Sequence, residues 1–244
     1  AAVPLADVTL TPQGDHLNAE WVLPAPVTVF HFNDEEMSVP ERVAEWTINS
    51  DAFAFDGDTL ARKDGAPFDT FSMTLLPAQA FYDRFYVPVS RIGDTGWSIY
   101  SAAFSPKDEN VRIRFAGLSD DDIVYAHGDR LSSDADLAAS DSEMIYFGPA
   151  SNVKEGAATL VAGGDVPDWL SKTLVRKTNA TAAHLATRFG GMPEEPPVVI
   201  MTYSPEGSGY SYKGGVVGRF ITFDLRGMTL DPDNEDFTDN LTNL

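Results

Sequence analysis

The chain has 244 residues, of which 43% are hydrophobic and 11% aromatic, a composition typical of folded globular proteins rather than disordered ones. Its 37 acidic and 17 basic residues give a net charge of −20, which argues against nucleic acids and anionic membrane surfaces as partners. The absence of cysteine excludes disulfide bonds, thiolate nucleophiles and cysteine-ligated zinc.

The first residues bear on localisation. Residues 1–6 contain no basic region and no long apolar region of a signal peptide, but small residues of this kind are typical of the end left by signal cleavage. We therefore expect a periplasmic or secreted protein. No apolar run approaches the roughly 20 residues that a membrane span needs.

Residues 1–163 are predicted to form a succession of short strands. β-Branched and aromatic residues recur between turn residues, which is a hairpin pattern, and residues 111–115 alternate strictly between apolar and polar. The predicted strands are 6–12, 16–23, 26–32, 43–48, 53–55, 59–63, 70–76, 97–104, 111–116, 123–127, 144–147 and 157–161, with a short helix near 77–82. This pattern predicts a β-sandwich domain.

The pattern changes at Gly163-Gly164, which we interpret as a flexible joint. Residues 165–168 are typical of a helix start, and the glycines at 190–191 and the proline at 193 of a helix end. The side of this helix that we expect to be buried carries residues 170, 174, 178, 181, 185 and 189. Apolar strands are predicted at 198–201 and 216–225. The chain is therefore expected to be mainly β, with an α/β segment at 164–244.

The last residues predict the beginning of another helix. Phe237, Leu241 and Leu244 are spaced i, i+4, i+7, and acidic residues at 233–236 suit its first turn. A helix of about two turns is not stable alone. We therefore expect the remainder of a parent chain, or a partner, to complete it.

The histidines give no catalytic or metal-binding pattern. His31 is interpreted as a strand residue, His127 as a turn residue and His184 as an exposed helix residue, and no two of the four histidines, including His16, share a metal-ligand spacing. A scattered Ser-His-Asp site is an alternative, but no G-x-S-x-G motif nominates its serine. We predict no catalytic residue in this chain.

Acidic residues cluster at 120–122, 134–141 and 231–239. Calcium binds oxygen-rich loops, but the last cluster lacks the glycine and the distal glutamate of an EF-hand loop. We interpret the clusters as solvated loops and a helix cap, with calcium as the alternative. No metal site and no cofactor are predicted for the chain itself.

Residues 203–218 form a connection rich in glycine and tyrosine between two apolar strands. Such loops line clefts, because glycine allows close approach and tyrosine offers a flat face with a hydroxyl. The candidate substrate-binding residues are Tyr210, Tyr212, Gly214, Gly215 and Val216. The alternative is a hairpin without a ligand.

The order of these elements resembles the N-terminal half of the gluzincin zinc aminopeptidases (families M1 and M61). The long helix ends in Phe189-Gly190-Gly191-Met192-Pro193, the strand Pro197-Val198-Val199-Ile200-Met201 follows, and then come the glycine-rich loop, a strand and a beginning helix. The resemblance implies a β-sandwich before a thermolysin-like domain, a G-x-M-E-N strand lining the cleft and a helix bearing H-E-x-x-H. For residues 165–244 the resemblance rests on the order and residue composition of the elements, not on a diagnostic motif.

The chain departs from that family pattern at two points. Aligning Ile221-Thr222-Phe223 with the end of the G-x-M-E-N strand places Gly215-Val216-Val217 at M-E-N, so Val216 replaces the glutamate that would bind a substrate's free amine. No H-E-x-x-H occurs, so the zinc ligands and the general base that the family needs are absent from this chain.

We therefore expect the N-terminal, non-catalytic portion of an exported metallopeptidase of this type, or of an inactive peptidase-like protein, forming one wall of a peptide cleft. The expected partner is a peptide or protein substrate, and zinc is implied only for a full-length parent. The alternative is a secreted all-β module that binds glycans or a protein. Its stacking platform would consist of Tyr82, Phe85, Tyr86, Trp97 and Tyr100.

Overall fold

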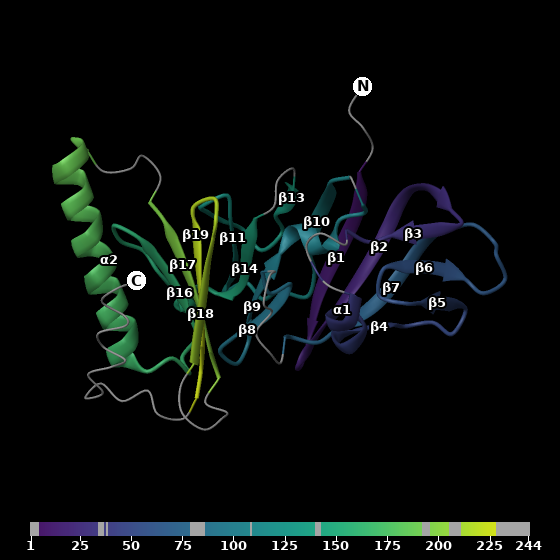
Figure 1. Cartoon of the computed structure of the whole chain (residues 1–244), viewed down its shortest axis with the longest axis horizontal. Coiled ribbons are helices and arrows are strands. Elements are labelled where there is room, and N and C mark those ends of the chain that lie inside the picture. Colours follow the sequence, from purple (N-terminus) through teal and green to yellow (C-terminus); the bar gives the residue numbers. More distant parts are fainter. Residues whose placement is uncertain are drawn as a thin grey trace. The chain divides into compact units, whose positions relative to one another are not determined.

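The computed structural model describes residues 5–33, 37, 39–78, 86–107, 109–139, 143–191, 196–204 and 211–227 (Figure 1). The chain forms two compact units, one of Ala1–Ser90 with Trp97–Gly148 and one of Arg91–Gly96 with Pro149–Leu244. The predicted mainly-β fold is confirmed. The proposed division into domains of residues 1–163 and 164–244 stays a prediction.

The largest sheet of the first unit has six strands. Its order is β13 (Asp136–Ala139), β10 (Val111–Phe115), β1 (Ala6–Gln13), β2 (His16–Val27), β7 (Phe68–Leu75) and β4 (Trp46–Ile48). β1 pairs antiparallel with β2 and parallel with β10. The register of β2 on β7 shifts between Val22 and Val27, where the prolines of the segment limit main-chain donors.

Two further sheets, of five and three strands, pack with the six-stranded sheet. The five-stranded sheet has the order β12 (Asp129–Leu131), β11 (Asp122–Ala126), β14 (Met144–Pro149), β9 (Gly96–Tyr100) and β8 (Val89–Ile92). The three-stranded sheet has the order β3 (Val29–His31), β6 (Thr59–Arg62) and β5 (Phe53–Phe55). Buried residues of all three sheets form one hydrophobic core.

The strict alternation predicted for residues 111–115 is confirmed. Val111, Ile113 and Phe115 are buried in the core, and the two arginines between them face the other side of β10. There Arg112 pairs with Asp7 at 3.2 Å, from Nη1 to Oδ1. This strand therefore separates an apolar face from a charged one.

Trp21 lies at the centre of the core. Its ring stacks on Phe71 with a centroid separation of 4.9 Å and an interplanar angle of 8°. Its indole N–H donates a hydrogen bond to the carbonyl of Phe104 over 3.1 Å. The fully buried tryptophan thus has both its apolar surface and its only donor satisfied.

Arg42 is fully buried and joins three separate segments. Its guanidinium donates to the carbonyls of Gly57 and Asn33, each over 2.7 Å, and lies 5.0 Å from the ring centroid of Phe32 and 5.5 Å from that of Trp46. Arg42 belongs to the helix α1 (Val39–Glu45). The strand expected over 43–48 is therefore wrong for residues 43–45, because anchoring of Arg42 outweighs the local preference for a strand.

Other boundaries also differ from the sequence-based expectations. The strand expected over 97–104 ends at Tyr100, and Ser101–Phe104 forms a 3-10 turn (η1) that closes with a hydrogen bond from the N–H of Ser105 to the carbonyl of Ala102. β8, β12 and β13 were not predicted, because their polar or very short sequences carry no clear alternation. The helix expected near 77–82 lies mostly outside the described residues.

The second unit contains one mixed sheet and one long helix. The sheet order is β15 (Val153–Lys154), β16 (Thr159–Ala162), β17 (Val198–Ser204), β19 (Phe220–Arg226) and β18 (Ser211–Val217), and a 3-10 turn (η2, Ala150–Asn152) precedes it. β16, β17 and β19 are parallel, whereas β15 and β18 are antiparallel to their neighbours. Figure 1 shows the helix α2 (Asp168–Phe189) along one face of this sheet.

The helix α2 follows the predicted start and end. It begins after Pro167 and ends at Gly190, whose φ of 84° suits a glycine C-cap. Leu170 and Leu174 are buried in a cluster with Val199 and Met201 of β17. Thr181, expected on the buried side, is exposed, and the neighbouring Ala182 is buried instead. The side chains at 185 and 189 lie outside the description.

The joint at Gly163 is explained by a close approach of two main chains. A Cβ atom at Gly163 would lie 2.3 Å from the main-chain nitrogen of Gly93, which belongs to the same unit. Only glycine fits there without displacing the main chain. Packing therefore accounts for this glycine.

Replacing Arg42 by alanine should lower the free energy of unfolding by about 3 kcal/mol or more, because a buried carbonyl and a part-buried one lose their donor and a cavity forms. Urea unfolding followed by tryptophan fluorescence measures the change. Arg62→Ala is the matched control, since Arg62 pairs with its near neighbour Asp64 at the surface, and it should leave the midpoint nearly unchanged. Equal effects of the two substitutions would contradict the anchoring role.

Candidate functional site: the edge strand β18

The candidate site residues lie on a β-hairpin rather than on a loop. β18 and β19 are joined by the two-residue turn Gly218-Arg219, in which Gly218 has a φ of 56°. A glycine with positive φ at the first turn position is typical of a type II′ hairpin. The expectation of a single strand over 216–225 is therefore wrong, because this turn reverses the chain after Val217.

Among the described residues, the strand β18 is the last strand of its sheet and pairs with β19 alone. Val217 and Phe220 flank the turn, so hydrogen-bonded pairs alternate from there along the hairpin. This alternation directs the main-chain N–H and C=O of Tyr212 and Gly214 away from β19. No hydrogen bond with another described residue satisfies Gly214 on that outer side.

Because Gly214 has no side chain, the edge strand does not protrude at this position on the face that α2 covers. The ring of Phe223, directly opposite in register, lies 3.7 Å from the position that a Cβ atom of Gly214 would occupy. Two residues further along the same face, the side chain of Val216 is 62% exposed. The edge therefore presents the main chain of Gly214, without a side chain, beside the apolar side chain of Val216.

The structure brings the described candidate residues into one strand. Gly214, Gly215 and Val216 occupy consecutive positions of β18, together with the main chain of Tyr212. Tyr210 and the side chain of Tyr212 lie outside the described residues. The role of all five in binding a substrate stays a prediction.

A polar cluster lies on the opposite face of the same sheet. The hydroxyl of Thr202 on β17 donates to the carboxylate of Asp224 on β19, and Lys213 on β18 is directly opposite Asp224. The Nζ of Lys213 is inaccessible to solvent and has no hydrogen-bond partner among the described residues. Burial raises the pKa of Asp224, although Thr202, Arg226 and Lys213 act in the opposite direction.

Sequence reasoning missed this cluster. Thr202 and Asp224 each occupy the fifth position of a seven-residue strand and are partners in the parallel register. A polar residue at the same position of two largely apolar strands is the signal that was available. Its meaning depends on the pairing of β17 with β19, which the sequence alone does not reveal.

The histidines behave largely as expected. His31 lies in β3, His184 is exposed on α2, and His127 is in a turn with a φ of 53°. The Nδ1 of His127 lies 3.0 Å from Oε2 of Glu143, whose carboxylate also accepts the main-chain N–H of His127. Among the described residues, no group of three or more His, Cys, Asp or Glu side chains is placed to hold a metal ion.

The acidic clusters are only partly described. The carboxylate of Asp122 accepts hydrogen bonds from the main-chain N–H and the hydroxyl of Ser119, which agrees with a solvated turn. The cluster at 231–239 and the helix expected to begin there lie outside the described residues. Calcium binding stays an untested alternative.

Two residues of the proposed aromatic platform are not accessible to solvent. Trp97 and Tyr100 are buried, and Tyr86 packs against Tyr100 with a centroid separation of 5.1 Å. Tyr82 and Phe85 lie outside the described residues. These contacts favour core packing over glycan stacking at Trp97 and Tyr100.

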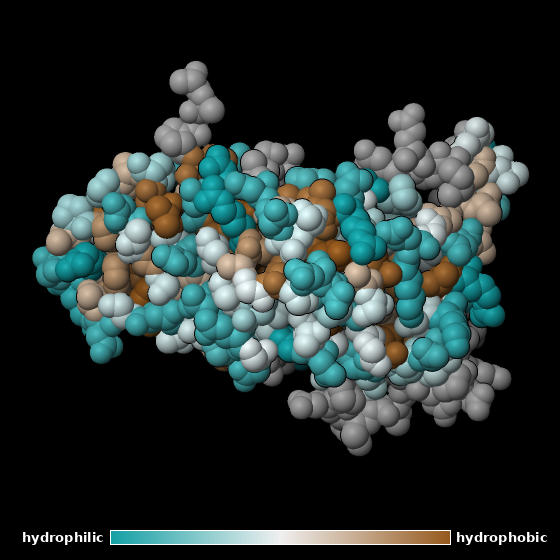
Figure 2. Space-filling model, turned by 180° about the vertical axis from the view of Figure 1, so that it is seen from behind, coloured by the Kyte–Doolittle hydropathy of each residue, from teal (hydrophilic) through white to brown (hydrophobic). Residues whose placement is uncertain are grey.

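Exposed apolar residues are sparse on the surface. Figure 2 shows hydrophilic residues over most of this face, with hydrophobic ones dispersed among them in small groups. The large hydrophobic side chains exposed in the described part of the chain are Val22, Val29, Val39, Val43, Leu76 and Val216. In the described residues, no helix has the length and apolarity needed to cross a membrane.

Comparison with known proteins identifies a likeness in fold. No protein-family model and no curated protein matches the chain. Its structure is similar to the crystal structure of an aminopeptidase N family protein from Idiomarina loihiensis, with a TM-score of 0.58 and 10% sequence identity. The match covers 98% of this chain and 46% of that protein, so this chain spans less than half of its length. At this identity, the likeness shows the fold alone.

Asp224→Asn should remove a pH dependence of stability. The pKa of Asp224 in the folded protein lies above the ordinary value of 3.8, so the folded state binds its proton more tightly and the contribution of Asp224 to stability falls as the pH rises from about 4. The variant should lack this contribution, so its stability should fall less than that of the wild type as the pH rises. Urea unfolding across this pH range tests this point. Asp51→Asn, at an exposed position, is the control and should retain the wild-type slope.

Proposed function

We propose that this chain is the N-terminal, non-catalytic portion of an exported aminopeptidase-like protein, in which β18 forms one wall of a peptide cleft. The observation that carries the proposal is the outward-facing main chain of an antiparallel edge strand at Tyr212 and Gly214. The likeness in fold to part of an aminopeptidase N family protein supports the same assignment.

An extended peptide would bind by adding a strand to β18. Main-chain hydrogen bonds provide affinity in this mode and require a strand edge whose N–H and C=O groups are accessible. Gly214 allows the peptide main chain to approach closely because it has no side chain. Val216 contributes an exposed apolar contact next to it. Tyr210 and Tyr212 are proposed to contact the peptide from the same segment.

The proposed cleft recognises the peptide's main chain rather than its amino terminus. In the gluzincin resemblance, Val216 stands where a glutamate would pair with the substrate's ammonium group. A valine side chain has no acceptor for an ammonium. The substrate class that suits this edge is therefore an extended peptide segment that need not present its own amino end.

Hydrolysis would depend on residues that this chain does not contain. Zinc in such peptidases polarises a carbonyl and activates water. The ligands would have to come from the remainder of a parent chain, because the 244 residues contain no H-E-x-x-H. Within the described residues, the donor set does not fit a catalytic zinc site, so no catalytic step is assigned here.

An exported location is part of the same proposal. The absence of cysteine suits a periplasmic or secreted protein.

Gly214→Pro should weaken peptide binding at β18 while leaving the hairpin paired. Proline removes the outward-facing N–H, and an edge strand tolerates this loss when that side faces solvent. A Cβ atom at this position would lie 3.1 Å from the carbonyl oxygen of Thr222, so Gly214→Ala is the matched control for steric cost. The probe is a fluorescein-labelled, end-blocked Ala-Val-Ala-Val-Ala peptide, measured by fluorescence anisotropy.

The proline variant should weaken binding of this peptide at least tenfold relative to the alanine variant. Circular dichroism confirms that both variants are folded. Equal affinities of the two folded variants, or no binding by the wild-type chain, would refute the proposed cleft wall.

The purified chain should not hydrolyse aminoacyl p-nitroanilides or end-blocked peptides, with or without added zinc. Release of p-nitroaniline, followed by absorbance, measures the first activity and chromatography measures the second. Zinc-dependent hydrolysis by the purified chain that a chelator abolishes would show that catalytic ligands are present after all.

A further inference from the structure

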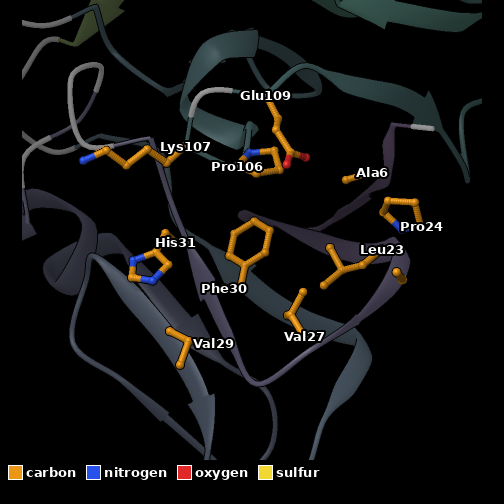
Figure 3. Close-up of a pocket in the computed structure, with 11 residues that line it drawn as sticks. Ala6, Leu23, Pro24, Val27, Val29, Phe30, His31, Pro106, Lys107 and Glu109 are labelled. Atoms are coloured by element: carbon orange, nitrogen blue, oxygen red, sulfur yellow. The ribbon is translucent and has the colours of Figure 1, made fainter. Parts of the chain in front are cut away.

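A cavity of about 460 Å³ opens at the edge of β3 in the first unit (Figure 3). Its base includes Phe30 and Leu23, and Ala6 lies to one side, all three of them buried members of the hydrophobic core. Pro106 and Glu109 face them from the segment that follows η1. The cavity therefore exposes core surface at a strand edge, with a volume in the usual range for ligand sites.

The main chain of β3 is paired on this side only in part. The N–H of Lys107 donates to the carbonyl of His31 over 2.9 Å, next to the bridge between Phe32 and Pro106. The other side of β3 pairs with β6. By alternation, Val29 directs its N–H and C=O to the same side as His31, where no hydrogen bond with a described residue satisfies them.

The exposed surroundings of this edge are apolar. The side chain of Val29 is 40% exposed, and Pro24 and Ala25, which form another part of the cavity wall, are exposed as well. Proline lacks an N–H, so this wall offers fewer donors to a ligand than an ordinary strand would. The main chain of Val29 therefore offers directional hydrogen bonds that Pro24 cannot provide.

Charge favours a basic ligand over a second copy of this chain. Figure 3 shows the carboxylate of Glu109 at the rim of the cavity and the ammonium group of Lys107 directed away from it. The whole chain carries a net charge of −20, so two copies repel each other. An apolar ligand with a cationic group would pack against the apolar floor of the cavity and pair with the carboxylate of Glu109 at its rim.

We propose that this cavity is a second polypeptide-binding site, which takes an extended apolar segment carrying one lysine or arginine. The segment pairs with the main chain of Val29, places apolar side chains against Phe30 and Leu23, and brings its cation to Glu109. This site is separate from β18 and does not depend on the function proposed for β18.

The test uses two end-blocked, fluorescein-labelled peptides, Arg-Val-Leu-Val-Ala and Glu-Val-Leu-Val-Ala, in fluorescence anisotropy titrations. The wild-type chain should bind the arginine peptide saturably and more tightly than the glutamate peptide. Glu109→Gln should weaken the arginine peptide about two- to fivefold, as expected for an exposed ion pair, and should reduce the difference between the peptides. Glu20→Gln, at an exposed position of β2, is the matched charge control and should have no effect.

Ala25→Trp should fill the cavity from its exposed wall and weaken the arginine peptide at least tenfold. Ala54→Trp, at an exposed position of β5, is its control for an added tryptophan. Gly214→Pro should leave this binding unchanged, which separates this site from the proposed cleft. No saturable binding by the wild-type chain, or equal binding by Ala25→Trp and Ala54→Trp, would overturn the proposal.

Self-association is tested by sedimentation velocity across a range of protein concentrations. A concentration-dependent dimer that Ala25→Trp abolishes would assign the cavity to a second copy and would also overturn the proposal. A monomer across this range is the expected result.

Discussion

The order of strands in the mixed sheet determines what the second unit can bind. β19 uses one side to pair with β17 in parallel and the other to pair with β18 through a two-residue turn. No further strand pairs with β18 in the described residues, so β18 is the edge of this sheet. The accessible main chain at Gly214, the exposure of Val216 and the position of Lys213 opposite Asp224 all follow from this arrangement.

Local signals in the sequence were sufficient where neighbouring residues decide the structure. The alternation at 111–115 and the glycine that ends α2 predicted the observed strand and helix end, because both depend on contacts close in sequence. The prediction failed at residues 43–45, where Arg42 is held by carbonyls of distant segments. It also failed at the turn Gly218-Arg219, whose two residues were read as the interior of one strand.

The candidate site was accessible to sequence reasoning in part. Glycines and Val216 in one short segment suggested a surface for close approach, and the structure places them consecutively on an edge strand. Thr202 and Asp224 are 22 residues apart, and only the parallel register joins them. The burial that raises the pKa of Asp224 likewise comes from tertiary packing, which a linear pattern does not specify.

The outward-facing main chain of β18 at Gly214 carries a risk of strand-to-strand association, which its two glycines do little to prevent. Overall repulsion between acidic molecules is the main protection available to such a surface. That repulsion weakens as the Debye length falls to about 3 Å near 1 M salt. We therefore expect the colloidal stability of this protein to depend on ionic strength, with molecules associating through their β18 strands at high salt concentration.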